Sequence, residues 1–314
     1  MPPSALARLA APSHAWDTVP VTLLDSGVLA RAEWEPHAIA HARRADAATA
    51  GHRERAPRHE KHPVEDFLYE YYETRPMRLR RWHPGVGVAL VDAPDYASSR
   101  YYVTRDGATF VDAGTFWKAR SRTVDYAEAL LRATASRSAR FGCFGLHEWA
   151  MVYRADETRH TTPLRLGAAA TDRVVEDHKI VCSHIDAFRF FTPEAIPLNT
   201  IQPTRESQAS DEQPGCLHAN MDLYKWSSKL VPAVSSKLVL DAFELAMSIR
   251  YLDMRASPYD VSALGLEPVR IETPEGKREY AERQAEFATT AAGLRSRLVD
   301  ACAAIRAAAE QVSV

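Results

Sequence analysis

The sequence lacks any long apolar run. No segment of its 314 residues approaches the roughly 18 consecutive apolar residues that suggest a membrane-spanning helix. The N-terminus also lacks the basic start and the long apolar core of a secretory signal peptide. We therefore expect a cytoplasmic protein without a membrane span.

Cysteine is scarce, and no two cysteines form a CxxC pair. The four positions are far apart: Cys143, Cys182, Cys216 and Cys302. This spacing favours a reduced protein with free thiols. The first three each lie within four residues of a histidine. Thiolate ligation of a metal is one interpretation, but buried thiols that pack as small apolar residues are the simpler one.

The chain has no excess of charge of either sign. With 39 basic and 41 acidic residues, its formal net charge is −2. Proteins that bind nucleic acid through its phosphates usually carry a basic surface, so this balance does not favour a nucleic-acid partner. Apolar residues make up 46% of the sequence, which is ample for a hydrophobic core.

Helical patterns dominate what is present. They predict helices over 123–140, 146–153, 217–226, 235–251 and 276–312, the last with Gly293 as a candidate break. Asp106 and Gly107 lie between two β-prone runs and predict a β-hairpin over 100–112. No internal repeat is present. The expected fold class is mainly α, a multi-helical single domain with a small β-hairpin or sheet.

Two domain assignments follow from composition. Residues 1–60, rich in Ala, Arg, His and Glu toward their end, are predicted as an N-terminal lead-in or arm. Residues 61–314 are predicted as a single helical catalytic domain. Within it, a long Pro-rich loop over 193–215 is unusual for a compact domain and suggests a functional role.

Three mostly apolar stretches each carry a histidine and a carboxylate. The pairs are His147 with Glu148, His184 with Asp186, and His218 with Asp222. An imidazole beside a carboxylate can hold a divalent metal or transfer a proton. Charged groups in apolar segments must find partners or stay neutral. We therefore predict that the three stretches meet in one metal site.

Spacing narrows the choice of carboxylate. His218 and Asp222 are four residues apart, so in a helix they share one face. His184 and Asp186 converge if their segment is a strand and diverge if it is a helix. The predicted ligands are the three histidines, with Asp222 or Asp186 as the carboxylate.

Other side chains have supporting roles in this prediction. Glu148 follows His147 directly, so in a helix the two side chains point about 100° apart and only one of them faces the metal. Glu148 is then a candidate catalytic residue, and Tyr224 and Lys225 are candidates to act on a substrate. Glu65 is a reserve ligand, although a helix start at Pro63 gives it a structural role as well.

The donor types favour iron without deciding the metal. Imidazoles with one carboxylate and open coordination positions suit non-haem Fe(II). Zinc hydrolysis uses similar ligands, and the three stretches lie too far apart for a short motif such as HExxH. A non-catalytic helical protein whose histidines are only core residues also stays open.

Five stretches resemble a known family. They are 62–67, 142–154, 182–191, 213–226 and 252–260. Together they resemble an actinobacterial family usually labelled "3-methyladenine DNA glycosylase", over about residues 60–300. The sequence departs from that label at Pro84–Gly87, which is similar to the hairpin of helix-hairpin-helix glycosylases but precedes a strand-like run in place of a helix. The catalytic Asp that such an enzyme needs downstream is missing too.

The family that these stretches resemble also includes the non-haem iron oxygenase of oxazinomycin biosynthesis, an antibiotic pathway. The resemblance implies a mononuclear Fe(II) enzyme of the dioxygenase type. Its substrates would be O₂ and a pyridine C-nucleoside, whose ring is rebuilt as a 1,3-oxazine with loss of cyanide. The alternative is a DNA or nucleoside N-glycosylase. The resemblance implies no ligand assignment, and the sequence leaves a homo-oligomer open.

Overall fold

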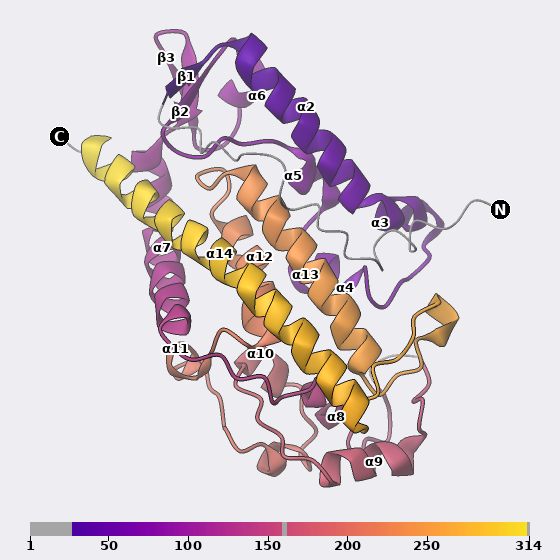
Figure 1. Ribbon diagram of the computed structural model, residues 1–314. Helices are drawn as coiled ribbons and strands as arrows, with labels where there is room; N and C mark the ends of the chain where they lie inside the picture. The colour runs from indigo at the N-terminus through magenta and orange to yellow at the C-terminus, as the bar shows by residue number, and fades with distance from the viewer. Residues whose placement is uncertain (1–26, 159–161, 313–314) are drawn as a thin grey trace.

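The computed structural model describes residues 27–158 and 162–312, which are mainly helical (Figure 1). The strands are β1 Gly27–Leu29, β2 Val88–Val91, β3 Tyr102–Arg105 and β4 Ala108–Val111. The α-helices are α2 Arg31–Ala48, α3 Ala50–Arg55, α4 Phe67–Tyr71, α5 Pro76–Arg80, α6 Pro94–Ala97, α7 Ala113–Ala135, α8 Leu146–Ala150, α9 Ala168–Glu176, α10 Ile185–Phe188, α11 Gln208–Asp211, α12 Leu217–Lys229, α13 Ser236–Ala256 and α14 Pro274–Val312. The predicted mainly α class with a small sheet is confirmed.

The longest helix, α14, organises the main core. It runs diagonally across the molecule and packs against α7, α12 and α13 (Figure 1). Its buried residues Leu294, Leu298, Cys302 and Ile305 recur every three or four positions. This is the period at which one face of a helix is apolar, so burial of that face holds the three partner helices together.

Two hydrogen bonds from α14 hold the start of α12. Gln284 Nε2 donates to the carbonyl oxygen of Gly215 at 2.6 Å, and Arg295 Nη2 donates to Asn220 Oδ1 at 2.6 Å. The side chains of Gln284 and Arg295 are buried, where a polar group without a partner is costly. The bonds therefore fix the first turn of α12, which carries His218.

The sheet lies at one end of the molecule, away from α8 and α9 (Figure 1). Its strand order is β1-β2-β4-β3, with β1 parallel to β2 and the other pairs antiparallel. The predicted hairpin is confirmed: Asp106 and Gly107 join β3 to β4, with φ of 51° and 79°. Positive φ at both positions is what a two-residue hairpin turn of type I′ requires.

Several helix boundaries differ from prediction. Helix α7 begins at Ala113 and not at Thr123, because the Asp112 side chain caps it by accepting a hydrogen bond from the Thr115 N–H. Helix α13 continues past residue 251 to Ala256. Helix α14 is unbroken at Gly293, since one glycine costs a helix only about 1 kcal/mol and packing easily offsets that.

The described part of the predicted N-terminal arm, residues 27–60, packs onto the helical body. Strand β1 pairs with β2, and α2 buries Trp34 and Ala45. Arg44 of α2 makes ion pairs with Asp241 at 2.7 Å and Glu244 at 2.5 Å on α13. A boundary at residue 60 therefore does not separate an arm from this body, and residues 1–26 lie outside the described part.

Two further expectations concern the glycosylase label and the membrane. Residues 84–87 lead into strand β2, so the segment lacks the helix that a helix-hairpin-helix motif needs after its glycines. Across 27–158 and 162–312, no helix combines the length and the apolar character needed to cross a membrane.

Candidate metal centre

The three histidines predicted as ligands meet in space. His147 lies on α8, His184 directly precedes α10, and His218 lies in the first turn of α12. The ring centroids of His147 and His218 are 4.6 Å apart, and those of His184 and His218 are 5.4 Å apart. His147 and His184 are buried, with 3% and 0% of their surface exposed. Residues 71 positions apart in the sequence thus form one cluster.

A glycine aims His147 at the cluster. Gly145 begins α8 with φ of 72°, in the left-handed region that favours glycine. A Cβ at this position would lie 3.4 Å from Tyr280 and 3.5 Å from Ala256. The sharp turn therefore directs α8 toward the core, where His147 is enclosed.

A second glycine sets the position of His218. A Cβ on Gly215 would lie 2.5 Å from the carbonyl oxygen of Arg140, so another residue there would force the two segments apart. The side chain of Asn220 donates to the carbonyl oxygen of Pro214 at 3.0 Å and closes the turn. The start of α12 is therefore held against the segment that leads into α8.

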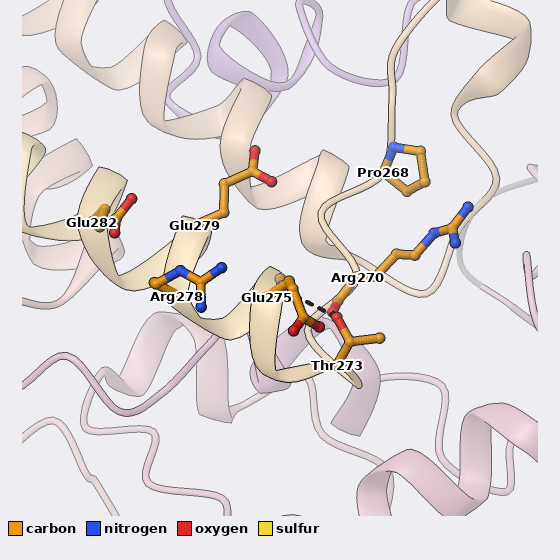
Figure 2. Close-up of a pocket in the computed structure, with 8 residues that line it drawn as sticks. Pro268, Arg270, Thr273, Glu275, Arg278, Glu279 and Glu282 are labelled. Carbon is orange, nitrogen blue, oxygen red and sulfur yellow. Dashed lines mark hydrogen bonds between the residues drawn. The ribbon is translucent and has the colours of Figure 1, made fainter.

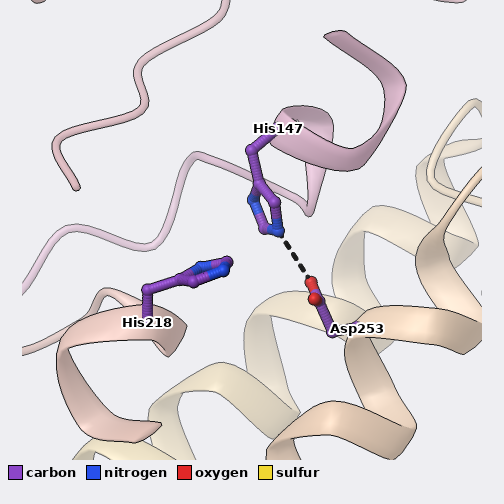
Figure 3. Close-up of side chains that lie close together, drawn as sticks. All are labelled: His147, His218 and Asp253. Atoms are coloured by element: carbon purple, nitrogen blue, oxygen red, sulfur yellow. Dashed lines mark ion pairs between the residues drawn. The ribbon is translucent and has the colours of Figure 1, made fainter. Parts of the chain in front are cut away.

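The first group of metal-type donors consists of His147, His218 and Asp253. Figure 3 shows the three side chains pointing toward one another from α8, α12 and α13. One ligand atom from each lies within 4.8 Å of the others. We refer to these three residues as the triad.

The contact between His147 and Asp253 is unusual. His147 Nε2 lies 3.0 Å from Asp253 Oδ1, yet neither atom has a hydrogen-bond partner within the described chain. Buried polar atoms normally have one. The two atoms form an ion pair when His147 is protonated, and their closeness also allows both to bind one shared metal ion.

Asp253 is held in place by a buried arginine. Its Oδ2 accepts a hydrogen bond from Arg250 Nη1 at 3.0 Å, and the same nitrogen donates to Glu148 Oε1 at 2.7 Å. Arg250 is 2% exposed. Outer partners of this kind orient the carboxylate that binds a metal. Glu148, predicted as catalytic, therefore supports Arg250, while His147 next to it faces the triad.

The second group consists of His184, Glu212 and Asp222. His184 Nε2 lies 3.1 Å from Glu212 Oε1 and 3.5 Å from Asp222 Oδ2. Neither ring nitrogen of His184 has a hydrogen bond within the described residues. We refer to these three residues as the His184 group. His218 and Asp222 share a face of α12, as helical spacing predicts, but their ligand atoms lie in different groups.

Asp186 belongs to neither group. Residues 185–188 are helical, so its side chain diverges from His184, as the helical alternative requires. It accepts hydrogen bonds from both terminal nitrogens of Arg205 and lies 3.3 Å from Lys225 Nζ. Lys225 also contacts Asp222. Asp186 is therefore the partner of cations and not the carboxylate beside the histidines.

Two more candidates have structural partners. Glu65 accepts hydrogen bonds from the Tyr251 hydroxyl and from Arg55, both at 2.7 Å, and is in neither metal-type group. The hydroxyl of Tyr224 donates to Thr74 Oγ1 at 2.7 Å in the core. Of the residues predicted to serve a substrate, Lys225 is the one in contact with a metal-type group.

Sequence reasoning missed Asp253 and Glu212. Asp253 lies two residues beyond the helix predicted over 235–251, but α13 continues through it and buries it. The available signal was a charged pair three residues apart, Arg250 and Asp253, in the mostly apolar stretch 245–254. Glu212 ends the Pro-rich segment, and nothing in its local sequence distinguishes it from other acidic residues.

Charge explains the proton affinities in this cluster. Burial lowers the pKa of His184, but the carboxylates of Glu212 and Asp222 outweigh burial and raise it to about 9. Burial also lowers the pKa of His147, but the carboxylate of Asp253 has the larger effect. The pKa of His147 therefore lies well above its usual value. Each group therefore requires positive charge, from protonated imidazole or from a metal ion.

A cavity adjoins the triad. It measures about 20 Å³, enough for one water-sized molecule, and its walls include Cys143, Cys182 and Cys216 beside His147 and His218. Burial raises the pKa of Cys182 to about 11 and that of Cys216 well above its usual value. Those two thiols stay protonated at neutral pH, in line with their interpretation as small apolar residues.

A larger hollow of about 380 Å³ lies on the surface at the start of α14 (Figure 2). Side chains of both charge signs line it, among them Arg270, Arg278, Glu275 and Glu282. None of the clustered histidines reaches it. Its charged rim is that of a solvated surface, so we assign no chemistry to it.

Comparison of the chain with models of known protein families, with curated proteins and with solved structures gave no match. The functional argument therefore starts from the donor atoms of the triad and the His184 group.

Proposed function

We propose that the chain is a non-haem Fe(II)-dependent oxygenase whose iron ligands are His147, His218 and Asp253. Two imidazoles and one carboxylate with open positions are the donor set typical of such oxygenases. The observation that carries the proposal is the close approach of His147 Nε2 and Asp253 Oδ1 without a hydrogen bond. Bound iron would supply the activation of O₂.

The surrounding residues prepare this set for an ion. Arg250 holds one oxygen of Asp253 and leaves the other directed at His147. The protonated thiols of Cys182 and Cys216 line the adjoining cavity, which has room for one small molecule. This cavity is too small for a nucleoside, so binding one requires the segments 181–183 and 213–218 to separate.

The proposed reaction follows from the family resemblance. An electron-rich dihydroxypyridine that bears a nitrogen-containing substituent and is joined to ribose by a C–C bond would be cleaved and rearranged to a 1,3-oxazine, with cyanide as co-product. Such a ring supplies electrons itself, so no 2-oxoacid is needed. Since both the oxazine and cyanide contain nitrogen, a substrate that reacts with O₂ alone must carry a second nitrogen besides that of its ring.

The test is anaerobic reconstitution with Fe(II), followed by measurement of bound iron and of O₂ uptake with a dihydroxypyridine C-riboside that carries a second nitrogen on its ring. The wild type should bind iron and consume O₂. Asp253→Asn should lose both. Asp241→Asn, the same change on the same helix α13 but outside the triad, should retain both.

Three outcomes would contradict this proposal. They are absence of iron binding, zinc as the bound metal together with hydrolysis, and release of a base from alkylated DNA in the presence of EDTA. The last would support the glycosylase alternative, which the strand after residue 87 does not favour.

A further inference from the structure

We infer that the His184 group is a second divalent-metal site beside the triad, so that the centre holds two ions. The inference rests on the proposed function only in assigning the first ion to the triad. The chemical class of its ligand is a divalent cation that accepts one imidazole and two carboxylates, such as Fe(II) or Mn(II).

His184 supplies the first argument. It is completely buried, and neither of its ring nitrogens has a hydrogen bond among the described residues. Its Nε2 faces Glu212 Oε1 at 3.1 Å and Asp222 Oδ2 at 3.5 Å. A buried nitrogen without a hydrogen bond is destabilising, and an ion placed among these three atoms would give Nε2 the bond that it lacks.

Glu212 supplies the second argument. It is 2% exposed, and its carboxylate accepts one hydrogen bond, from the neutral side chain of Gln208 at 2.5 Å. Within the described residues it has no ion pair with a lysine or an arginine. A buried carboxylate requires a compensating cation. The bond from Gln208 orients the carboxylate, as outer partners of metal ligands do.

Among the described residues, Lys225 is the side-chain amine that would compete with a metal ion for Asp222, and it has a second carboxylate partner. Its ammonium group contacts Asp222 but also lies 3.3 Å from Asp186 Oδ2. When an ion binds, Lys225 can remain on Asp186 while Asp222 turns its Oδ2 to the metal. The hydroxyl of Tyr72, which donates to Asp222 Oδ1 at 3.1 Å, keeps the carboxylate in place.

Helix α12 connects the two sites. His218 belongs to the triad, and Asp222, one turn later, belongs to the His184 group. The ring of His218 lies 5.4 Å from that of His184, so the two ions would be neighbours. The alternative occupant is a proton: a charged His184 can balance the same carboxylates without a second metal.

Titration with Mn(II) distinguishes a bound metal ion from a proton on His184 as the occupant of the His184 group. The metal-free full-length protein is titrated anaerobically with Mn(II), and bound metal is counted after gel filtration. The wild type should bind two equivalents. Glu212→Gln should bind one, with a stronger six-line EPR signal because the neighbouring ion that broadens it is gone. Glu244→Gln, a matched change at an ion pair on α13, should still bind two.

Circular dichroism of each variant verifies that it is folded, and Asp222→Asn provides a second loss-of-site variant. One equivalent in the wild type that Glu212→Gln leaves unchanged would overturn the inference and leave the proposed function standing. Two equivalents with no O₂ uptake by the iron form would overturn the proposed function and support the second site. The wild type could bind one equivalent of Mn(II) that is lost in Glu212→Gln but retained in Asp253→Asn. This result would support a metal site at the His184 group and contradict one at the triad.

Discussion

Buried histidines occur at both ends of the described part of this molecule, and their hydrogen bonds differ. Near the sheet, His41 Nε2 is 2.8 Å from the carbonyl oxygen of Leu79, and His83 Nδ1 is 3.0 Å from the Tyr102 hydroxyl. At the candidate metal centre, His147 Nε2 and both nitrogens of His184 have no hydrogen bond within the described chain. Burial is therefore not the mark of a site. The distinguishing feature is that metal-type ligand atoms converge there without hydrogen-bonding one another.

The largest expected effect comes from replacing one histidine at each end of the molecule by alanine. His147→Ala should lower iron affinity and O₂ uptake by more than about 100-fold, because even outer partners of a metal cost 10–100-fold. His83→Ala should leave iron content unchanged and lower the free energy of unfolding by about 1–3 kcal/mol, since it orphans the Tyr102 hydroxyl. Iron analysis and urea unfolding measure both. Equal iron content in the two variants would remove the contrast.

The next effect concerns the arginine behind Asp253. Arg250→Met leaves Glu148 and Asp253 buried without their shared cation. We expect a loss of about 3–5 kcal/mol in the free energy of unfolding of the metal-free protein, and a 10–100-fold loss of iron affinity. Added Fe(II) should recover part of the stability, because the ion compensates Asp253. If saturating iron does not raise the melting temperature, Asp253 does not bind it.

The two ends should respond to pH with opposite sign. Burial lowers the pKa of His83 to about 3, whereas an unfolded histidine has a pKa of about 6.5. Below pH 6.5 the unfolded chain binds a proton that folded His83 does not, so its contribution to stability falls by about 2 kcal/mol between pH 6.5 and 5. The slope of unfolding free energy against pH in this range should flatten in His83→Phe.

His184 reverses this dependence in the metal-free protein. Its folded pKa, raised to about 9, exceeds the unfolded value, so its stabilising contribution is complete below about pH 6.5 and is lost as the pH rises through 9. His184→Gln should lose stability at pH 6 and little at pH 9.5, measured by urea unfolding in EDTA. An equal loss at both pH values would show that His184 is neutral in the fold.

The smallest effect separates two aspartates. Asp186→Asn removes a carboxylate held by Arg205 and Lys225 but absent from both donor groups. Metal content should stay within about twofold of the wild type, since no metal-type donor is removed and the asparagine oxygen can still accept a hydrogen bond from Lys225. Asp222→Asn should lose one equivalent of Mn(II). The same metal loss in both variants would show that the cationic partners of Asp186 act on the metal.

Local patterns were enough to predict the helical class, the hairpin at Asp106 and Gly107, and the stretches that carry His147, His184 and His218. Apolar periodicity and turn residues act within a few positions, so the sequence expresses them directly. The start of α7 was missed because Thr123, where the predicted helix begins, is a residue type that also caps helices, as Asp112 does. The extension of α13 was missed because Arg250 and Asp253 are held by contacts with Glu148 and His147 of α8, which no local pattern indicates.

The sequence by itself determined which residue types are available: three histidines in apolar segments, each of which had to be paired or bound once buried. Only the tertiary structure decided their partners. Helical spacing joined His218 to Asp222, but packing of α13 and the Pro-rich segment against α12 brings in Asp253 and Glu212 instead. The reason is that a metal-type site is defined by where donor atoms converge in space, and convergence depends on long-range helix packing that neighbouring residues do not encode.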